Sequence, residues 1–448
     1  MTDHLTPISD LEDLLDADAD LRAVLSQSLQ MARARARSDL KQPLYDALQW
    51  PTTIAEYKDY LRWFLRWIPR QSDAEAWAEG SPGERQAREV SDRLAHFFWL
   101  VDQHPDHSDR AVESSPAFGD WLTRFAREWG SYLDTPDSFD EDILRSFVDD
   151  SPEYAVQDSM IDGRSNMPSG LLTFNQYFAR ELHSGLRPIA EPNRNSTVVS
   201  PADCSFQHVY EIGSDSAIPA TRIKGTHTYG TVTQLMQGSD YADRYAGGTF
   251  AHYMLPPSAY HRFHVPVSGT VLEAFTITGQ VYLDVGLDDG TFASKDAAST
   301  GFEFSQTRGI VTLDTASSPD GDIGIITVVA VGMAHVASVR LTAAPGGFVA
   351  KGDEFGYWRV VATPHRDKHS GLARESRDDG RIEARVVHAD VDPGLEVLAH
   401  RTRRAAPRTK VHLRKSPRRR VRPRRPAPRV VPATADPRGC NRRKLCRP

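Results

Sequence analysis

Hydrophobic residues recur at helical spacing in the first part of the chain. The sharpest stripe follows Thr53, which with Glu56 has the spacing of a capping box, and it stops before Pro69. Its apolar members are Ile54, Tyr57, Leu61, Phe64, Leu65 and Ile68. Because these positions fall on one face at a period of 3.6 residues, they predict an amphipathic helix packed against a core.

Three further stripes predict more helices after the first. Aromatic and aliphatic residues recur within 90–101, 121–129 and 143–147, and Ser138 with Glu141 is expected to cap the last of these helices. Seven of the eight tryptophans precede residue 130, and packing between helices explains them better than a ligand cage does.

The helical pattern defines the first half of the domain organisation. We expect residues 29–160 to form a helical N-terminal domain. Residues 1–28 are expected to be a poorly ordered acidic N-terminus, although Leu11–Leu29 has the pattern of an amphipathic helix that is either frayed or docked.

Residues 165–358 are expected to form a second, mainly β domain. After a helix over Leu171–Leu182, the chain consists of short β-branched and aromatic runs separated by Gly, Pro, Asp and Ser. Ile323–Val331 and His335–Leu341 are the strongest candidate strands, and Gly347–Gly356 reads as a tight hairpin of a sandwich. The predicted fold class is therefore α+β, with an all-helical domain followed by a sandwich-like one.

The composition changes again after Trp358. Residues 359–448 contain no Phe, Tyr or Trp, whereas the first 358 residues hold all 40. Residues 401–448 carry 19 Lys and Arg, eight Pro and the single acid Asp436. Such a segment has little apolar surface to bury, so 359–448 is expected to be a disordered Arg/Pro-rich tail.

Charge and cysteine content limit the possible partners of the body. Removing the basic tail leaves 35 basic and 59 acidic residues in 1–400, a net charge of −24, which argues against nucleic acid as a partner. We find no uncharged apolar run of about 18 residues and no signal-peptide pattern, so no integral membrane segment is expected. Cys204 is the only cysteine of the body, which fits a reducing cytoplasm.

The richest chemistry lies in the stretch 250–269, which holds three histidines. Pro256, Pro257 and Pro266 interrupt its apolar runs and place His261 and His264 at a bend. Residues three apart point to opposite faces of a strand, so the two imidazoles are expected to have different roles. Structural histidines, a zinc site and acid–base chemistry all remain open from spacing alone.

Several stretches together resemble the phosphatidylserine decarboxylase family. They are Phe174–Leu182 with Gly185–Ile189, Ser200–Asp203, Ile223–Gly225, Tyr260–Gly269 and Val349–Tyr357, and they occur in the order and spacing of that family. The resemblance covers about 170–358. The helical region resembles, more loosely, the N-terminal domain of the soluble branch that includes fungal L-tryptophan decarboxylase.

The resemblance implies a cofactor made from the chain itself. In this family a serine of a Gly-Ser motif attacks the preceding carbonyl, the chain splits, and the serine becomes a pyruvoyl group that accepts the substrate amine and then the electrons released with carbon dioxide. By motif match, His264 is the base for cleavage and Asp203 the carboxylate that orients it. His261 is the candidate for handling the proton during decarboxylation, and no metal is expected.

The chain departs from the family where the serine should stand. No Gly-Ser pair follows Trp358, and the first serine, Ser370, lies too far along the chain. Trp358 to Thr363 can be encoded by TGG CGG GTG GTA GCG AC, which read two bases later gives Ala-Gly-Gly-Ser-Asp. We therefore expect that the reading frame changes here and that the chain as written has lost its pyruvoyl-forming serine and its small subunit.

The sequence leaves three alternative functions to be tested. The first is a pyruvoyl-dependent decarboxylase acting on phosphatidylserine or an aromatic L-amino acid, and the acidic body favours the free amino acid over an anionic lipid surface. The second is a non-catalytic scaffold or binding protein built on the same fold. In the third, the basic tail recruits nucleic acid or membrane, although a solvated run is the default for such a tail. The sequence indicates no oligomeric state.

Overall fold

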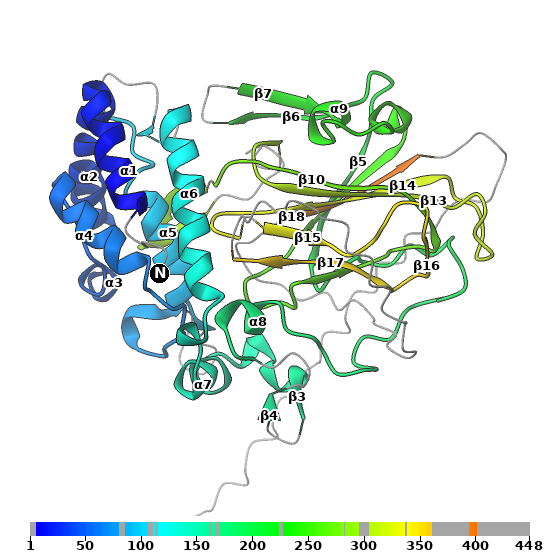
Figure 1. The fold of residues 1–448 in the computed structure, drawn as a ribbon, viewed down its shortest axis with the longest axis horizontal. Coiled ribbons are helices and arrows are strands. Elements are labelled where there is room, and N and C mark those ends of the chain that lie inside the picture. Colours follow the sequence, from blue (N-terminus) through cyan, green and yellow to red (C-terminus); the bar gives the residue numbers. More distant parts are fainter. Residues whose placement is uncertain are drawn as a thin grey trace, which may run out of the picture. The chain divides into compact units, whose positions relative to one another are not determined.

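The computed structural model describes most of the chain up to residue 360 and one later strand (Figure 1). The described residues are 6–79, 86–105, 111–112, 115–161, 164–165, 171–223, 227–281, 283–294, 304–336, 338–360 and 394–400. Helices come first and strands follow, so the predicted α+β class is confirmed. Lys224 and Gly225 of the family-like motif lie outside the described residues, as do 361–393 and 401–448 of the expected tail.

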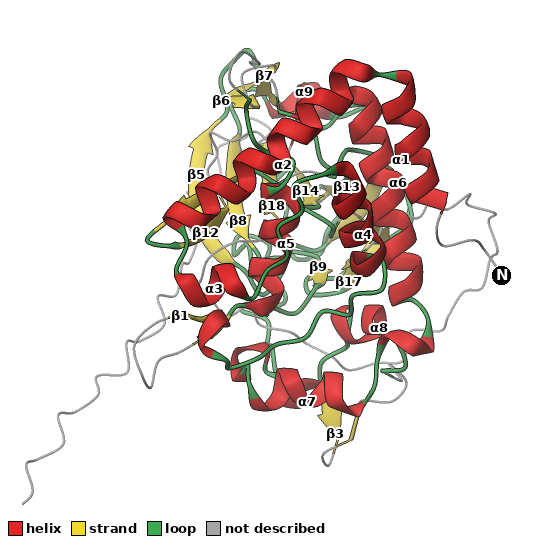
Figure 2. Cartoon of the chain, turned by 90° about the vertical axis from the view of Figure 1, so that its left-hand side faces the viewer, coloured by secondary structure: helices red, strands yellow, loops and turns green. Residues whose placement is uncertain are grey.

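Residues 6–28 are helical apart from a single break at Asp18, contrary to the expectation of a poorly ordered segment over 1–28. Helices α1 (Thr6–Ala17) and α2 (Ala19–Asp39) bury the leucines of the amphipathic pattern, including Leu11 and Leu25. Helix α1 packs against α6 (Pro116–Leu133), where the Trp121 indole N–H donates to the Pro7 carbonyl at 2.7 Å (Figure 2). Burial of the leucine stripe compensates for the acidic composition, so the docked alternative is the correct one.

The central helices follow the sequence pattern closely. Helix α4 (Ile54–Phe64) begins at the predicted capping box of Thr53 and Glu56. The other helices of this region are α3 (Gln42–Asp46), α5 (Glu89–Trp99), α6 and α7 (Glu141–Asp149). Their aromatic residues pack against one another, as predicted for the tryptophans. Among the described residues, no helix is long and apolar enough to cross a membrane.

Two predicted helix boundaries are wrong. Helix α7 is capped by Asp140 rather than Ser138, whose hydroxyl instead donates to backbone carbonyls and accepts the Phe174 N–H at 3.0 Å. The helix expected over 171–182 shortens to α8 (Phe174–Phe178). It ends there because Arg180 turns inward, where its guanidinium is almost fully buried.

Two antiparallel sheets form the β region. The larger has the strand order β16 (Phe348–Val349), β10 (Gly269–Ile277), β13 (Arg308–Asp314), β14 (Ile325–Val331), β18 (Gly394–His400), β8 (Thr249–Met254) and β5 (Ser205–Glu211). The smaller has the order β15 (Ser338–Leu341), β17 (Glu354–Arg359) and β9 (Arg262–His264). They meet at Gly309, where a Cβ would lie 2.3 Å from Val339, so only glycine permits this close approach.

Short elements complete the described chain. They are β1 (Ala78–Glu79) with β2 (Gln86–Ala87), β3 (Met160–Ile161) with β4 (Arg164–Ser165), β6 (Ala217–Ile223) with β7 (His227–Thr231), β11 (Val285–Asp288) with β12 (Thr291–Ser294), and helix α9 (Val232–Leu235).

The expected hairpin over 347–356 is not a paired hairpin. Its first strand, β16, pairs with β10 of the larger sheet, whereas its second, β17, pairs with β9 and β15 of the smaller one. The turn therefore links the two sheets. His335 likewise belongs to a turn rather than to the start of a strand, because β15 begins only at Ser338.

Residues beyond the expected end of the folded region enter the sheet. Strand β18 (Gly394–His400) lies between β14 and β8 and pairs with both in antiparallel register. The expectation that the whole of 359–448 is disordered is therefore wrong for this segment. The physical reason is that β14 and β8 each have an edge to satisfy, and the short run Leu-Glu-Val-Leu-Ala is long enough to bridge them.

The turn that links the sheets is held by a buried lysine. The Lys351 ammonium donates to the carbonyls of Glu191, Arg194 and Thr197 at 2.7, 2.6 and 2.8 Å. Burial lowers the pKa of Lys351 to about 8. The next residue, Gly352, has a φ of +93°, a conformation that glycine adopts without strain.

Replacing Gly352 by alanine should destabilise the fold strongly, because a Cβ there meets Ile189 at 2.6 Å in addition to the unfavourable φ. Gly346→Ala is a matched control, since Gly346 has a φ of +84° and nothing within 4 Å of its added Cβ. We expect about 1 kcal/mol of destabilisation for the control and at least about 3 kcal/mol for Gly352→Ala in urea unfolding. Equal losses would mean that Ile189 moves aside.

Removing β18 should weaken the larger sheet. A chain ending at residue 413 retains β18, whereas one ending at residue 360 leaves the edges of β14 and β8 open. We expect the shorter chain to melt more than about 10 °C lower and to aggregate, and the longer one to match the full chain. Equal melting temperatures for both truncations would show that β18 contributes nothing to stability.

Candidate active site

The bend at 260–267 is fixed by the pairing of β9 with β17. His264 pairs opposite Glu354, and the carbonyl of His261 accepts the Trp358 N–H at 3.0 Å. The Arg262 side chain spans the two strands, with both Glu354 carboxylate oxygens 2.9 Å from Nη1. This ion pair fixes the register, and the register sets where both histidines lie.

The two histidines face different surroundings, as the strand spacing predicted. His264 lines a small hollow of about 10 Å³, whereas His261 lines an apolar pocket of about 40 Å³. Among the described residues, no group of three His, Cys, Asp or Glu side chains is placed to hold a metal ion.

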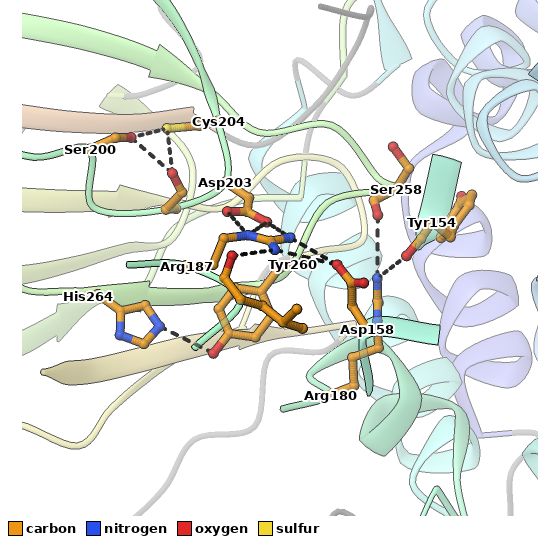
Figure 3. Close-up of polar contacts among 12 residues, drawn as sticks. Tyr154, Asp158, Arg180, Arg187, Ser200, Asp203, Cys204, Ser258, Tyr260 and His264 are labelled. Carbon is orange, nitrogen blue, oxygen red and sulfur yellow. Dashed lines mark hydrogen bonds and ion pairs between the residues drawn. The ribbon is translucent and has the colours of Figure 1, made fainter. Parts of the chain in front are cut away.

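His264 is buried and held by two hydrogen bonds. Its Nδ1 lies 2.8 Å from the Gly352 carbonyl. Its Nε2 lies 3.2 Å from the Tyr260 hydroxyl (Figure 3). Because a carbonyl only accepts, Nδ1 carries the proton and Nε2 accepts from Tyr260. Burial lowers the pKa of His264 to about 4, so the ring is neutral at physiological pH.

Asp203 lines the same hollow as His264 but is bonded elsewhere. The Arg187 guanidinium donates to both Asp203 oxygens, with Nε 3.0 Å from each and Nη2 2.8 Å from Oδ2 (Figure 3). Burial raises the pKa of Asp203, and the hydrogen bonds from Arg187 oppose that shift. The structure thus brings Asp203 and His264 to one hollow without a hydrogen bond between them.

His261 is completely buried, and only one of its two ring nitrogens has a hydrogen-bond partner among the described residues. Its Nε2 lies 2.9 Å from the Pro257 carbonyl, and its ring stacks on Phe178 with centroids 3.9 Å apart. Nε2 therefore carries the proton, which leaves a lone pair on Nδ1, and that atom has no partner. Burial lowers the pKa of His261 to about 3, so the ring is neutral.

The apolar pocket beside His261 is walled by both halves of the described chain. Its apolar and aromatic lining consists of Pro69, Val90, Leu94, Trp129, Phe147, Tyr154, Phe174, Tyr177, Phe178, Pro257, Val336 and Val360. Its basic lining residues are Arg180, His261 and His335. An apolar cavity with a few convergent polar groups is the usual form of a small-molecule site.

Arg180 gives the pocket a buried positive charge. Its Nη2 donates to the Tyr154 carbonyl at 2.7 Å and lies 3.5 Å from the Ser258 carbonyl (Figure 3). Its Nε is buried without a partner, and within the described chain no carboxylate forms an ion pair with it. A buried guanidinium left in this state favours an anionic ligand.

The chain leaves β17 at the edge of this pocket. Trp358 is fully buried, and Val360 is fixed to Asn175 by the bond from its N–H to Oδ1 at 3.0 Å. Val360 lines the pocket together with His261. Val360, the last described residue before β18, therefore lies beside His261 rather than beside Asp203.

Arg180 and His335 were missed as site residues by sequence reasoning. Arg180 stands inside the family-like stretch 174–182, so the motif contained the signal although its role did not follow from it. His335 gave no such signal, because the turn that carries it enters the aromatic core through contacts with helices more than 200 residues earlier.

Comparison with known proteins agrees with the motifs. The family model described as phosphatidylserine decarboxylase matches residues 174–363. The chain is 32% identical to phosphatidylserine decarboxylase proenzyme 3 of Schizosaccharomyces pombe, over 43% of this chain and 18% of that protein. It is 35% identical to the Vibrio cholerae proenzyme, over 31% of this chain and 45% of that protein.

A third relative is matched over more of its length. The decarboxylase iboD of Amanita muscaria is 27% identical over 54% of this chain and 73% of that protein. The chain thus spans less than half of the two proenzymes and most of the Amanita protein. Residues 174–363 of the chain are therefore similar to the phosphatidylserine decarboxylase family, as the motifs predicted.

Proposed function

We propose that this protein is a decarboxylase whose substrate, an aromatic L-amino acid, binds in the pocket lined by His261, Arg180 and Val360. The observation that carries the proposal is that Val360, which follows β17, lines a pocket that holds a neutral imidazole and a buried guanidinium bonded only to backbone carbonyls among the described residues. These groups fit a ligand with one carboxylate and an apolar remainder. The reducing cytoplasm is the proposed location, since Cys204 is the only cysteine in 1–400.

The lining of the pocket favours an aromatic amino acid over phosphatidylserine. Trp129, Phe147 and Phe174 offer flat apolar surfaces to a ring. The charge of −24 on residues 1–400 also opposes approach to an anionic lipid surface. The serine head group of phosphatidylserine carries the same amine and carboxylate, so the lipid named in several relatives is the alternative substrate.

The pyruvoyl group implied by the family fits the pocket but not the sequence as written. His261 Nδ1 is an unpaired acceptor in the pocket that Val360 lines, so a base stands beside the residue after which the group would be attached. Yet Val361 and Ala362 stand there, and the serine of the alternative frame would fall across their codons. When present, the group would supply a carbonyl that accepts the substrate amine and withdraws electrons as carbon dioxide leaves.

The chain's own residues have separate proposed tasks. Arg180 binds the substrate carboxylate and orients it, while the aromatic lining excludes water. His261 can take up or release a proton at Nδ1, because its Nε2–H is occupied by the Pro257 carbonyl. Asp203 and His264 are proposed to act in cleavage, with Tyr260 and Gly352 fixing the tautomer of His264.

Restoring the alternative frame after Trp358 should produce a self-processing enzyme. We expect the chain as written to run as one band of about 50 kDa, and the restored chain to give two bands and to release carbon dioxide from an aromatic amino acid. Denaturing electrophoresis and a carbon dioxide assay check both points. Two fragments from the chain as written would refute the frame change.

Substituting each histidine separately in the restored enzyme should show that one acts in cleavage and the other in decarboxylation. His264→Ala is expected to block cleavage, whereas His261→Ala should permit cleavage and lower kcat by about 100-fold or more. His252→Ala is the control, because His252 is another buried imidazole of β8 that lines neither cavity. The control should cleave and turn over normally.

The register of β9 and β17 indicates which result would contradict these assignments of the two histidines. Trp358 bonds to His261, so the chain leaves β17 on the side of His261 and away from His264. Loss of cleavage in His261→Ala together with normal cleavage in His264→Ala would assign both proton transfers to His261. The hollow at Asp203 would then have a purely structural role.

A further inference from the structure

The turn after β14 places an unusual histidine in the pocket wall. His335 is 1% exposed and is surrounded by aromatic rings, with centroids 4.6 Å from Phe97, 4.9 Å from Phe98 and 5.1 Å from Trp129. The turn is closed by the bond from the Met333 N–H to the Val336 carbonyl at 3.1 Å. Ala334 within it has a φ of +50°, an unfavourable conformation for a residue with a side chain.

Among the described residues, neither nitrogen of His335 has a hydrogen-bond partner. Leaving a buried polar atom unpaired lowers stability, and a phenylalanine in the same place would avoid that loss. Other buried histidines are better satisfied, since His96 Nδ1 lies 3.3 Å from the Tyr60 hydroxyl and His264 is bonded at both nitrogens. His335 differs in that it lines the apolar pocket of about 40 Å³ beside His261.

The polar groups of the pocket lie on two sides, and their positions suggest how a ligand would be oriented. Arg180 and His261 come from the side of the pocket formed by α8 and β9, which suits the carboxylate and amine. His335 stands among aromatic residues of the helical domain, which suits a ring. A neutral imidazole offers one acceptor nitrogen to a ring N–H or O–H, and burial keeps it neutral by lowering the pKa of His335 to about 3.

We propose that His335 is a specificity-determining residue that accepts a hydrogen bond from a donor on the ligand's aromatic ring. The ligand class is then an amino acid whose ring carries one N–H or O–H, such as an indole or a phenol, rather than a plain phenyl ring. This inference rests on the proposed amino-acid substrate, but binding to the pocket requires neither cleavage nor turnover.

The test compares two ligands that differ only at the ring donor. L-tryptophan carries the indole N–H, and 3-benzothienyl-L-alanine replaces it by sulfur with nearly the same shape. Calorimetric titration of the full chain as written should give about 5- to 100-fold tighter binding of tryptophan, because a buried hydrogen bond is at stake. Equal affinities, or no binding of either ligand by the folded chain, would overturn the proposal.

Variants of His335 separate recognition from packing. His335→Phe keeps a ring in the aromatic cluster. In this variant the ratio of the Kd of 3-benzothienyl-L-alanine to the Kd of L-tryptophan should fall to one or below. His335→Gln restores an acceptor and should recover part of the preference, which also covers the case in which His335→Phe fails to fold. His96→Phe is the matched control outside the pocket and should leave the preference unchanged.

The possible results distinguish failure of the role of His335 from failure of the proposed reaction. An unchanged preference in folded His335→Phe would overturn the role of His335, whatever the enzyme does. Selective tryptophan binding that depends on His335, combined with no carbon dioxide release by the restored enzyme, would support this inference and refute the proposed reaction. Decarboxylation of phosphatidylserine without binding of either amino acid would overturn both the aromatic substrate and the role of His335.

Discussion

The pairing of β9 with β17 is the constraint on which the site depends. Three residues of β9 are held against β17 by the register and by the ion pair of Arg262 with Glu354. The same pairing turns His264 toward Asp203, turns His261 toward the apolar pocket and brings Val360 to that pocket's wall. A slip of one residue would exchange the two faces and separate every one of these groups from its surroundings.

A second dependence runs through the larger sheet. Without β18, the antiparallel order would break between β14 and β8, and β5 with β8 would lose its connection to the other strands. Asp203 immediately precedes β5, so the hollow that it shares with His264 depends on that part of the sheet. A segment beyond the active-site end of β17 thus stabilises the scaffold that positions Asp203.

Sequence patterns within a few residues correctly predicted those features that depend only on neighbouring residues. The capping box at Thr53, the apolar stripe of α4 and the opposite surroundings of His261 and His264 all follow from residues within one turn or one strand. The α+β class follows in the same way from the change of hydrophobic period. These features need no knowledge of distant contacts.

Features created by long-range contacts could not be predicted. The end of α8 depends on the burial of Arg180, the separation of β16 from β17 depends on which sheet each strand joins, and β18 depends on a gap between strands more than 60 residues earlier. His335 is the clearest case. Nothing in its neighbouring sequence indicates that its ring will lie between helices.

The pocket also explains why the helical and β regions need each other. The β region supplies His261 and Val360, and the helical region supplies Trp129 and Phe147 opposite them. A cavity lined only by polar groups would hold water. The aromatic wall instead lowers the local dielectric constant, which strengthens the attraction between Arg180 and any anion that enters. Because the wall of the pocket is built from both regions, we propose that substitutions among the helices change which ligand is accepted while the residues of β9 and β17 stay in place.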